Sequence, residues 1–122
     1  MTPAAAVLKR ESAKARREAL EEALALALRA HRLHEGMVRQ YRPFNDKGYA
    51  FDFAWPDRET PVLVEVQGGI WSGGAHVRPQ GVLRDMDKLN RAAVRGWCVL
   101  QVSADDIKSG KAVALIREGL AL

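Results

Sequence analysis

Cysteine is almost absent from this 122-residue chain, and its single cysteine, Cys98, can form neither an intrachain disulfide nor a zinc site built from thiolates. Long apolar runs are absent too, since the longest, residues 23–28, is far shorter than the roughly 20 residues that a membrane-spanning helix needs. We expect no secretory signal peptide, because the apolar segment near the N-terminus is short and a densely charged stretch follows it. These absences predict a soluble, cytoplasmic protein without a membrane anchor.

The composition is that of an ordinary globular protein, with 48% hydrophobic and 28% charged residues. The length fits one domain, residues 1–122, and is too short for two independent cores. The net charge of +4 favours a polyanionic partner such as DNA. The sequence contains no zinc finger, helix-turn-helix or other base-reading motif, so DNA would be recognised by its shape rather than by its sequence.

The spacing of apolar residues predicts helices and strands in the order α-β-β-β-α-β-α. The predicted helices cover residues 12–34, 82–95 and 104–122. The predicted strands cover residues 37–41, 49–55, 62–67 and 97–103. The second helix has its apolar stripe at Leu83, Met86, Leu89 and Ala93. Because a helix that joins two strands of one sheet implies a parallel crossover, we predict an α/β fold with a mixed sheet flanked by helices.

Two carboxylates lie where the strand pattern predicts burial. In the second predicted strand, the face opposite Asp52 carries the aromatic residues Tyr49, Phe51, Phe53 and Trp55. In the third, Glu65 lies among valines. If the two strands pair as a hairpin, Asp52 and Glu65 are neighbours on one face, where two carboxylates repel each other unless a cation lies between them. The alternative is that each carboxylate pairs with a nearby arginine or lysine.

Ligands that are all oxygen select a hard cation. Asp52, Glu65 and the backbone carbonyl of Val66 therefore predict a site for Mg2+, with Mn2+ as a substitute. Such an ion lowers the pKa of a bound water and stabilises negative charge on an attacked phosphate. The residues thus favour metal-assisted chemistry on a phosphate group.

The placing of Asp52 on one strand and Glu65-Val66-Gln67 on the next resembles the signature of the PD-(D/E)XK nuclease superfamily, in which a hairpin joins an aspartate to Glu-x-Lys. The predicted order of elements matches the restriction-endonuclease-like α-β-β-β-α-β core of that superfamily over most of the chain. Four segments are similar to small phage and bacterial endonucleases of the Holliday-junction-resolvase-like and Vsr-like branches: residues 51–55, 64–69, 85–90 and 96–100. The resemblance implies a metal-dependent, structure-specific DNA endonuclease of a bacterial or phage-infected bacterial cell.

One departure from the superfamily pattern is Gln67, which stands where the family has lysine and carries no charge. Its amide can still orient a water or ligate a metal. The resemblance implies that the missing cation comes from the following helix, where Lys88 is the candidate; the alternative is that Lys88 pairs with Asp85 on a solvated face. It also implies that Glu21, on the first helix, completes a catalytic set with Asp52, Glu65, Gln67 and Lys88.

Basic residues outside this set supply candidate DNA contacts, which position a phosphate backbone without reading its sequence. In the glycine-rich segment 68–81, His76 could protonate a leaving oxygen or bind a phosphate, and Arg78 could clamp one. The alternative is a loop whose polar residues are incidental. The other candidate contacts are Lys14, Arg17, Arg39 and Arg42.

The leading hypothesis is a homodimeric Holliday junction resolvase that acts in DNA recombination and repair. A four-way junction presents two symmetry-related strands, so paired cuts need two active sites. One alternative is a Vsr-like endonuclease that nicks DNA at mismatches or lesions as a monomer. The other is a catalytically inactive DNA-binding module of the same fold, which Gln67 keeps open. The preference for junctions rests on the resemblance alone.

Overall fold

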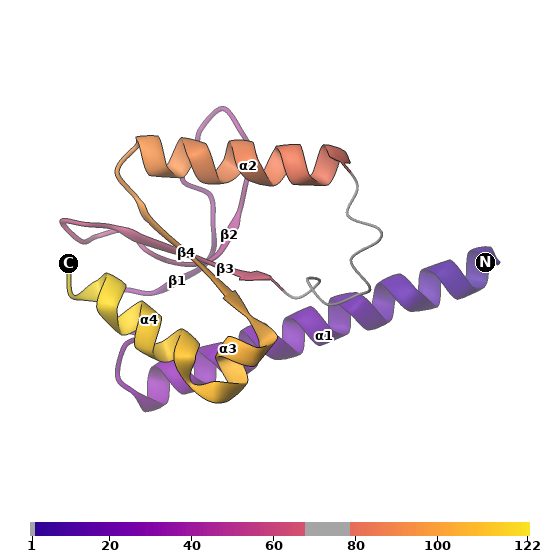
Figure 1. Cartoon of the computed structure of the whole chain (residues 1–122), viewed down its shortest axis with the longest axis horizontal. Helices are drawn as coiled ribbons and strands as arrows, with labels where there is room; N and C mark the ends of the chain where they lie inside the picture. The colour runs from indigo at the N-terminus through magenta and orange to yellow at the C-terminus, as the bar shows by residue number, and fades with distance from the viewer. Residues whose placement is uncertain (1, 68–78) are drawn as a thin grey trace.

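Helices on both faces of a four-stranded sheet form the described part of the molecule (Figure 1). The structure is a computed structural model, and it describes residues 2–67 and 79–122. The helices are α1 (Pro3–Ala30), α2 (Pro79–Val94), α3 (Ala104–Ser109) and α4 (Lys111–Leu120). The strands are β1 (Val38–Tyr41), β2 (Phe51–Trp55), β3 (Val62–Gln67) and β4 (Cys98–Ser103). Among the described residues, no helix combines the length and the apolar character that crossing a membrane requires.

The sheet is mixed, with the strand order β1-β2-β3-β4. The pairs β1–β2 and β2–β3 are antiparallel, whereas β3 and β4 are parallel and are separated in the chain by α2. Figure 1 shows α2 on one face of the sheet and α1, α3 and α4 on the other. The predicted α/β fold with a mixed sheet flanked by helices is therefore confirmed, and the more specific restriction-endonuclease-like core stays a prediction.

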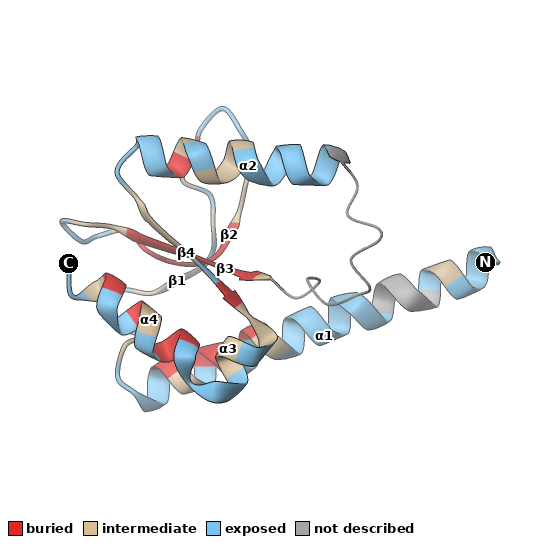
Figure 2. Ribbon diagram, in the orientation of Figure 1, coloured by how far each residue is buried: buried red, intermediate tan, exposed pale blue. Residues whose placement is uncertain are grey.

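Each face of the sheet has its own apolar cluster. The larger cluster packs α1 and α4 against the sheet, and its bulkiest members are Leu24, Leu28, Phe53, Trp55 and Ile116. The smaller cluster lies on the α2 side and contains Phe44, Phe51, Ala54, Leu63 and Ala92. Figure 2 shows the buried residues along the strands and on the inner sides of α1 and α4, while most of α2 is exposed. Because hydrophobic stabilisation scales with the apolar area buried, α2 is held less firmly than α1 and α4.

Helix α2 presents a different face to the sheet from the one that its apolar stripe predicts. Ala92 is fully buried and Leu89 is half-buried. Three members of the predicted stripe are exposed instead: Leu83, Met86 and Ala93. The prediction is wrong for these three because a polar contact also determines the rotation of the helix, and the Lys88 ammonium lies 2.7 Å from a carboxylate oxygen of Glu65 on β3.

The alternation predicted for β2 breaks at Asp52. Phe53 and Trp55 belong to the cluster under α1 and α4, but Phe51 and Tyr49 pack in the cluster on the α2 side. The expectation that these four aromatic residues share one face is therefore wrong. The physical reason is that the paired register of β2 with β3 ends at Phe53, and beyond it acidic side chains replace main-chain partners.

Element boundaries differ from the prediction by a few residues in several places, and two differences are larger. Helix α1 begins at Pro3 and not at residue 12, because the Thr2 side chain caps the first turn and proline is favourable at the first helical position. Its apolar spacing does not reveal this part, since the first buried residue among its described side chains is Glu21. The helix predicted over residues 104–122 is two helices, because Gly110 between them adopts a left-handed φ of +85°.

Candidate functional site

The open end of the β2–β3 hairpin, away from its turn, carries two acidic side chains. Main-chain N–H groups there donate hydrogen bonds to these side chains instead of to main-chain carbonyls. The Val66 N–H donates to Asp52 Oδ2 at 2.8 Å, and the Asp52 N–H donates to Glu65 Oε1 at 3.1 Å. Both residues are buried, with Asp52 2% and Glu65 7% exposed. The two carboxylates are thus neighbours across the hairpin, as the strand pattern predicts.

Lys88 reaches this pair from α2. Its Nζ lies 2.7 Å from Glu65 Oε2 and donates to the carbonyl oxygen of Ala50 at 2.6 Å. The ammonium is also 4.4 Å from the centre of the Phe51 ring, and the Lys88 side chain is 12% exposed. Lys88 therefore contacts the buried carboxylate of Glu65 and does not lie on a solvated face beside Asp85.

Glu21 enters the site from α1, and a residue that sequence reasoning missed connects it to Asp52. Gln40 Nε2 donates to Glu21 Oε1 at 2.9 Å and to Asp52 Oδ1 at 3.3 Å. The register of β1 on β2, in which Tyr41 pairs with Phe51, puts Gln40 opposite Asp52. The φ of Gln40 is +50°, a left-handed conformation that residues other than glycine rarely adopt. Such strain persists where the surroundings hold a residue in place, and here the two carboxyl groups do so.

Arg17, predicted as a DNA contact, also belongs to the site. Its Nη2 lies 3.4 Å from both carboxylate oxygens of Asp52. Arg17 precedes Glu21 by four residues, so the two side chains lie on one face of α1. This spacing is a sequence signal that could have placed Arg17 beside the carboxylates. The sequence holds no comparable signal for Gln40, because the short pattern of β1 does not determine its register on β2.

The pKa values of the three carboxyl groups reflect burial and mutual repulsion. Burial, together with the hydrogen bonding and charge of Asp52, raises the pKa of Glu21 from 4.5 to about 7. Burial also pushes the pKa of Asp52 upward, but hydrogen bonds with Glu21 and the Val66 N–H outweigh it and hold this pKa below its usual value. Burial raises the pKa of Glu65, although Lys88 acts in the opposite direction. Burial thus favours the protonated forms of Glu21 and Glu65, and the negative charge of Asp52 adds to this effect.

The oxygen atoms of this site suit a hard divalent cation. Asp52 and Glu65 supply carboxylate oxygens, and the main-chain carbonyl of Val66 follows directly on β3. Mg2+ is usually bound through one or two carboxylates, with waters completing its octahedron. Within residues 2–67 and 79–122, no group of three or more His, Cys, Asp or Glu side chains has the arrangement of a metal cage. A Mg2+ site on Asp52 and Glu65 therefore stays a prediction.

Gln67 lies on the same strand as Glu65 but has a different partner. Its side-chain amide donates to Gln101 Oε1 on β4 at 2.9 Å. Among the hydrogen bonds of the described residues, none joins the Gln67 side chain to Asp52 or Glu65. Its role in orienting a water stays a prediction.

The predicted DNA contacts differ in how freely they face solvent. Lys14 and Arg42 are exposed. Arg39 is less free, because its guanidinium forms an ion pair with Glu22 at 2.9 Å and covers the ring of Phe53. Two further predicted contacts lie outside the described residues: His76 and Arg78.

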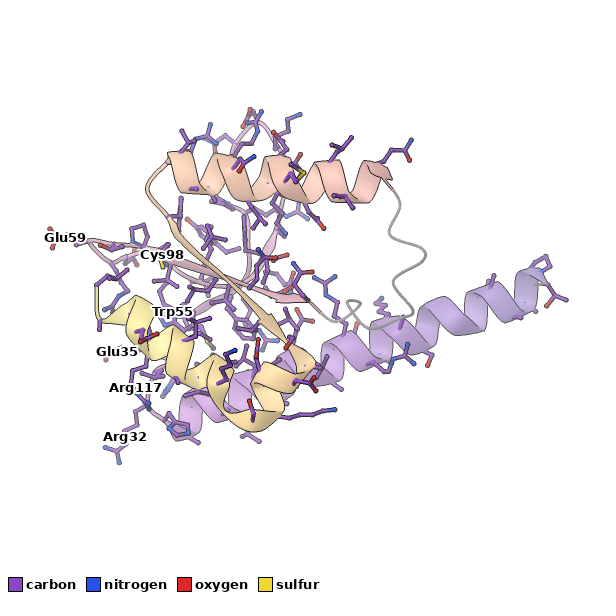
Figure 3. All side chains as sticks on the ribbon, viewed as in Figure 1. Arg32, Glu35, Trp55, Glu59, Cys98 and Arg117 are labelled. Atoms are coloured by element: carbon purple, nitrogen blue, oxygen red, sulfur yellow. The ribbon has the colours of Figure 1, made fainter. Side chains whose placement is uncertain are left out.

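Two open pockets lie at the turn end of the hairpin, opposite the carboxylates. Each has a volume of about 320 Å³; one is lined by Trp55 and Glu35, and the other by Arg32, Glu35 and Arg117. Figure 3 shows Arg32, Glu35 and Arg117 gathered at one end of the molecule, below Trp55. None of the predicted site residues lines either pocket, so the pockets and the carboxylate site are separate features.

The interpretation of this site rests on the sequence and the geometry alone. The resemblance to the PD-(D/E)XK superfamily accordingly stays a prediction from the residues. Comparisons of the chain with models of protein families, with curated proteins and with solved structures gave no match.

Proposed function

We propose that this protein is a Mg2+-dependent DNA endonuclease that cuts branched DNA as a homodimer. The observation that carries the proposal is the convergence of three buried carboxyl groups with one desolvated lysine: Glu21, Asp52, Glu65 and Lys88. Burying a charged group costs several kcal/mol unless partners compensate it. Clusters of buried titratable groups with strongly shifted pKa values are therefore concentrated at functional sites.

Ion pairing alone does not account for this cluster. Asp52 pairs with Arg17 and Glu65 with Lys88, which is the alternative that the sequence leaves open. Among the described residues, however, the three carboxyl groups face only these two cations, and the Arg17 side chain is 51% exposed. Burial is the main cause of the pKa of Glu21 near 7 and of the raised pKa of Glu65, and the negative charge of Asp52 raises both further. A divalent cation between Asp52 and Glu65 would offset that charge.

The residues of the site divide the chemistry between them. A bound Mg2+ would supply an activated water and neutralise charge on the attacked phosphate. Asp52 and Glu65 would hold the ion with the carbonyl of Val66, and Glu21 would support them from α1. The Nζ of Lys88, already desolvated beside Glu65, would donate to a phosphate oxygen and stabilise the charge that develops there.

A direct catalytic role is less well supported for Gln67 than for Lys88. It would orient the attacking water only by giving up its hydrogen bond to Gln101. Lys88 needs no such exchange, because its Nζ already contacts a carboxylate of the site. The positive charge that the superfamily places two residues after its glutamate is therefore assigned to Lys88.

DNA as the substrate is supported by the charge and position of α1. The N-terminal half of this helix extends beyond the sheet (Figure 1), and Lys14 on it is exposed. Arg17, three residues later, joins this basic surface to Asp52. A basic surface that leads to an acidic metal site suits a phosphodiester backbone, which it would bind without reading the bases.

A second copy of the chain is supported by apolar side chains on the outer face of α2. Leu83 is 63%, Met86 53% and Val94 88% exposed, and their spacing places them on one side of the helix. Three exposed apolar side chains on one side of a helix are the kind of surface that a partner can cover. We expect a dimer in sedimentation experiments and a monomer for Leu83→Asp. A monomeric wild-type protein would contradict the homodimer and favour the Vsr-like alternative.

A cleavage assay tests the activity. The purified chain is incubated with a labelled four-way junction, a linear duplex and a mismatched duplex, with Mg2+ or with EDTA. We expect paired nicks in the junction that require Mg2+, that are absent in Asp52→Asn and that fall by about 100-fold or more in Lys88→Met. Glu22→Gln, which neutralises an exposed carboxylate next to Glu21, should cleave like the wild type.

The other outcomes of this assay separate the alternatives. Nicks confined to the mismatched duplex would favour the Vsr-like endonuclease. Binding to DNA without product in Mg2+ or Mn2+ would contradict the enzyme and leave the inactive DNA-binding module, for which the uncharged Gln67 is the supporting feature.

A further inference from the structure

Arg17 forms an ion pair with Asp52, one of the carboxylates that would bind the proposed metal. Its Nη2 lies 3.4 Å from both Asp52 Oδ1 and Oδ2. The other partners of Asp52 carry no positive charge: the Val66 N–H donates to Oδ2, the Gln40 amide donates to Oδ1, and the carboxyl group of Glu21 also hydrogen-bonds to Asp52. The guanidinium is therefore the only cation within salt-bridge distance of Asp52 among the described residues.

Arg17 can leave this position without any change of the backbone. Its side chain is 51% exposed, whereas that of Asp52 is 3% exposed, so the arginine reaches the carboxylate from the solvent side. The residues around Arg17 on α1 are exposed from residue 12 to residue 19, so none of the described elements buries them. Lys88, the other cation of the site, is 12% exposed and enclosed between α2 and the sheet.

We propose that Arg17 is an exchangeable counter-ion of the metal site, which neutralises Asp52 while the site holds no metal and moves to a DNA phosphate when a divalent cation binds. This inference rests on the proposed metal site. A cation in contact with Asp52 oxygens repels a guanidinium at 3.4 Å, so the two compete for the same carboxylate. The released guanidinium lies beside the incoming backbone, where its fork of donors matches a phosphate.

Competition predicts that removing Arg17 tightens metal binding. A half-exposed ion pair of this kind contributes a factor of about two to five to an equilibrium constant. Arg17→Met retains much of the length of the side chain and removes its charge. We therefore expect its dissociation constant for Mn2+, measured without DNA from the paramagnetic signal of the free ion, to fall about two- to five-fold below that of the wild type.

Arg16→Met is the matched control. Arg16 is the preceding residue on the same helix, is exposed, and hydrogen-bonds to Ser12 rather than to the site. Arg16→Met removes the same charge as Arg17→Met. A general electrostatic effect would therefore tighten Mn2+ binding equally in both variants, and that result would overturn the proposal. Unchanged or weaker Mn2+ binding by Arg17→Met would overturn it as well. Far-ultraviolet circular dichroism and urea unfolding would verify that both variants are folded.

A second readout tests the transfer of Arg17 to DNA. In Ca2+, the affinity for a duplex should fall in Arg17→Met, and the slope of its logarithm against that of the salt concentration should decrease by about one phosphate contact. An unchanged slope would contradict the transfer. Asp52→Asn separates the two proposals. If Mn2+ binding depends on Asp52 but not on Arg17, only the exchange fails; if no variant alters it, the metal site and the exchange fail together.

Discussion

Replacing Glu21 by glutamine should stabilise the metal-free protein at alkaline pH, although it removes a carboxyl group from the proposed site. Glu21 is 7% exposed, and its Oε1 accepts the amide of Gln40 at 2.9 Å. Glutamine has nearly the same size, can accept that hydrogen bond and can donate one to Asp52. The substitution therefore removes chiefly the negative charge of an ionised Glu21.

The sign and size of the effect follow from the pKa of Glu21. In the unfolded chain this carboxyl group ionises near pH 4.5, whereas in the folded protein it keeps its proton up to about pH 7. The folded state therefore loses stability as the pH rises between these values; the cost is absent below pH 4.5 and complete above pH 7. At about 1.4 kcal/mol for each pH unit, the full cost is about 3 kcal/mol. A weaker hydrogen bond to Asp52 in the variant would reduce the gain, so this figure is an upper value.

Urea unfolding at pH 5 and pH 8, in EDTA, measures the effect. We expect Glu21→Gln to exceed the wild type by up to about 3 kcal/mol at pH 8 and by about 1 kcal/mol or less at pH 5. Glu22→Gln, on the exposed side of the same helical turn, should show no gain that grows with pH. Equal gains at the two pH values, or a loss at pH 8, would refute the argument that Glu21 is ionised at a cost.

Three further substitutions test how the site and its scaffold are held. Because Gln40 has a φ of +50°, Gln40→Gly should be more stable than Gln40→Ala by about 1 kcal/mol in urea unfolding, the reverse of the usual order in a strand. Trp55→Phe should lose about 2 kcal/mol, because Trp55 is 1% exposed and its Nε1 donates to the Leu33 carbonyl at 2.9 Å; an unchanged unfolding midpoint would contradict this. Gly110→Ala should lower the melting temperature. The cost is about 1 kcal/mol and comes from backbone strain alone, because an added Cβ meets nothing within 4 Å.

The core of the candidate site could be predicted because its signals are local. A carboxylate within a buried strand is costly in any fold, so Asp52 and Glu65 are conspicuous in the sequence. A hairpin with a short turn then leaves little freedom in which residues face each other, and the observed pairing of Phe53 with Val64 brings the two carboxylates together. Predicting that Lys88 and Glu21 belong to the site required the resemblance as well, because many helix positions carry lysine or glutamate.

The parts that could not be predicted depend on contacts between distant segments. Gln40 lies opposite Asp52 only through the register of β1, and a four-residue strand with a half-exposed pattern does not determine that register. The prediction of which face of α2 is buried was wrong for a related reason. An apolar stripe indicates the buried face when hydrophobic contacts dominate, but here the ion pair of Lys88 with Glu65 turns Leu83 and Met86 outward.

The glutamine at position 67 and the lysine at position 88 are best understood as one feature. Glu65 and Gln67 share a face of β3, and that face also receives Lys88 from α2. A lysine at position 67 would bring a second ammonium to the face on which Glu65 already binds Lys88, and two like charges there would repel each other. A neutral glutamine avoids this cost and bonds to Gln101 instead. If the proposed endonuclease is correct, Lys88, whose Nζ lies 2.7 Å from Glu65, would supply the positive charge that Gln67 lacks.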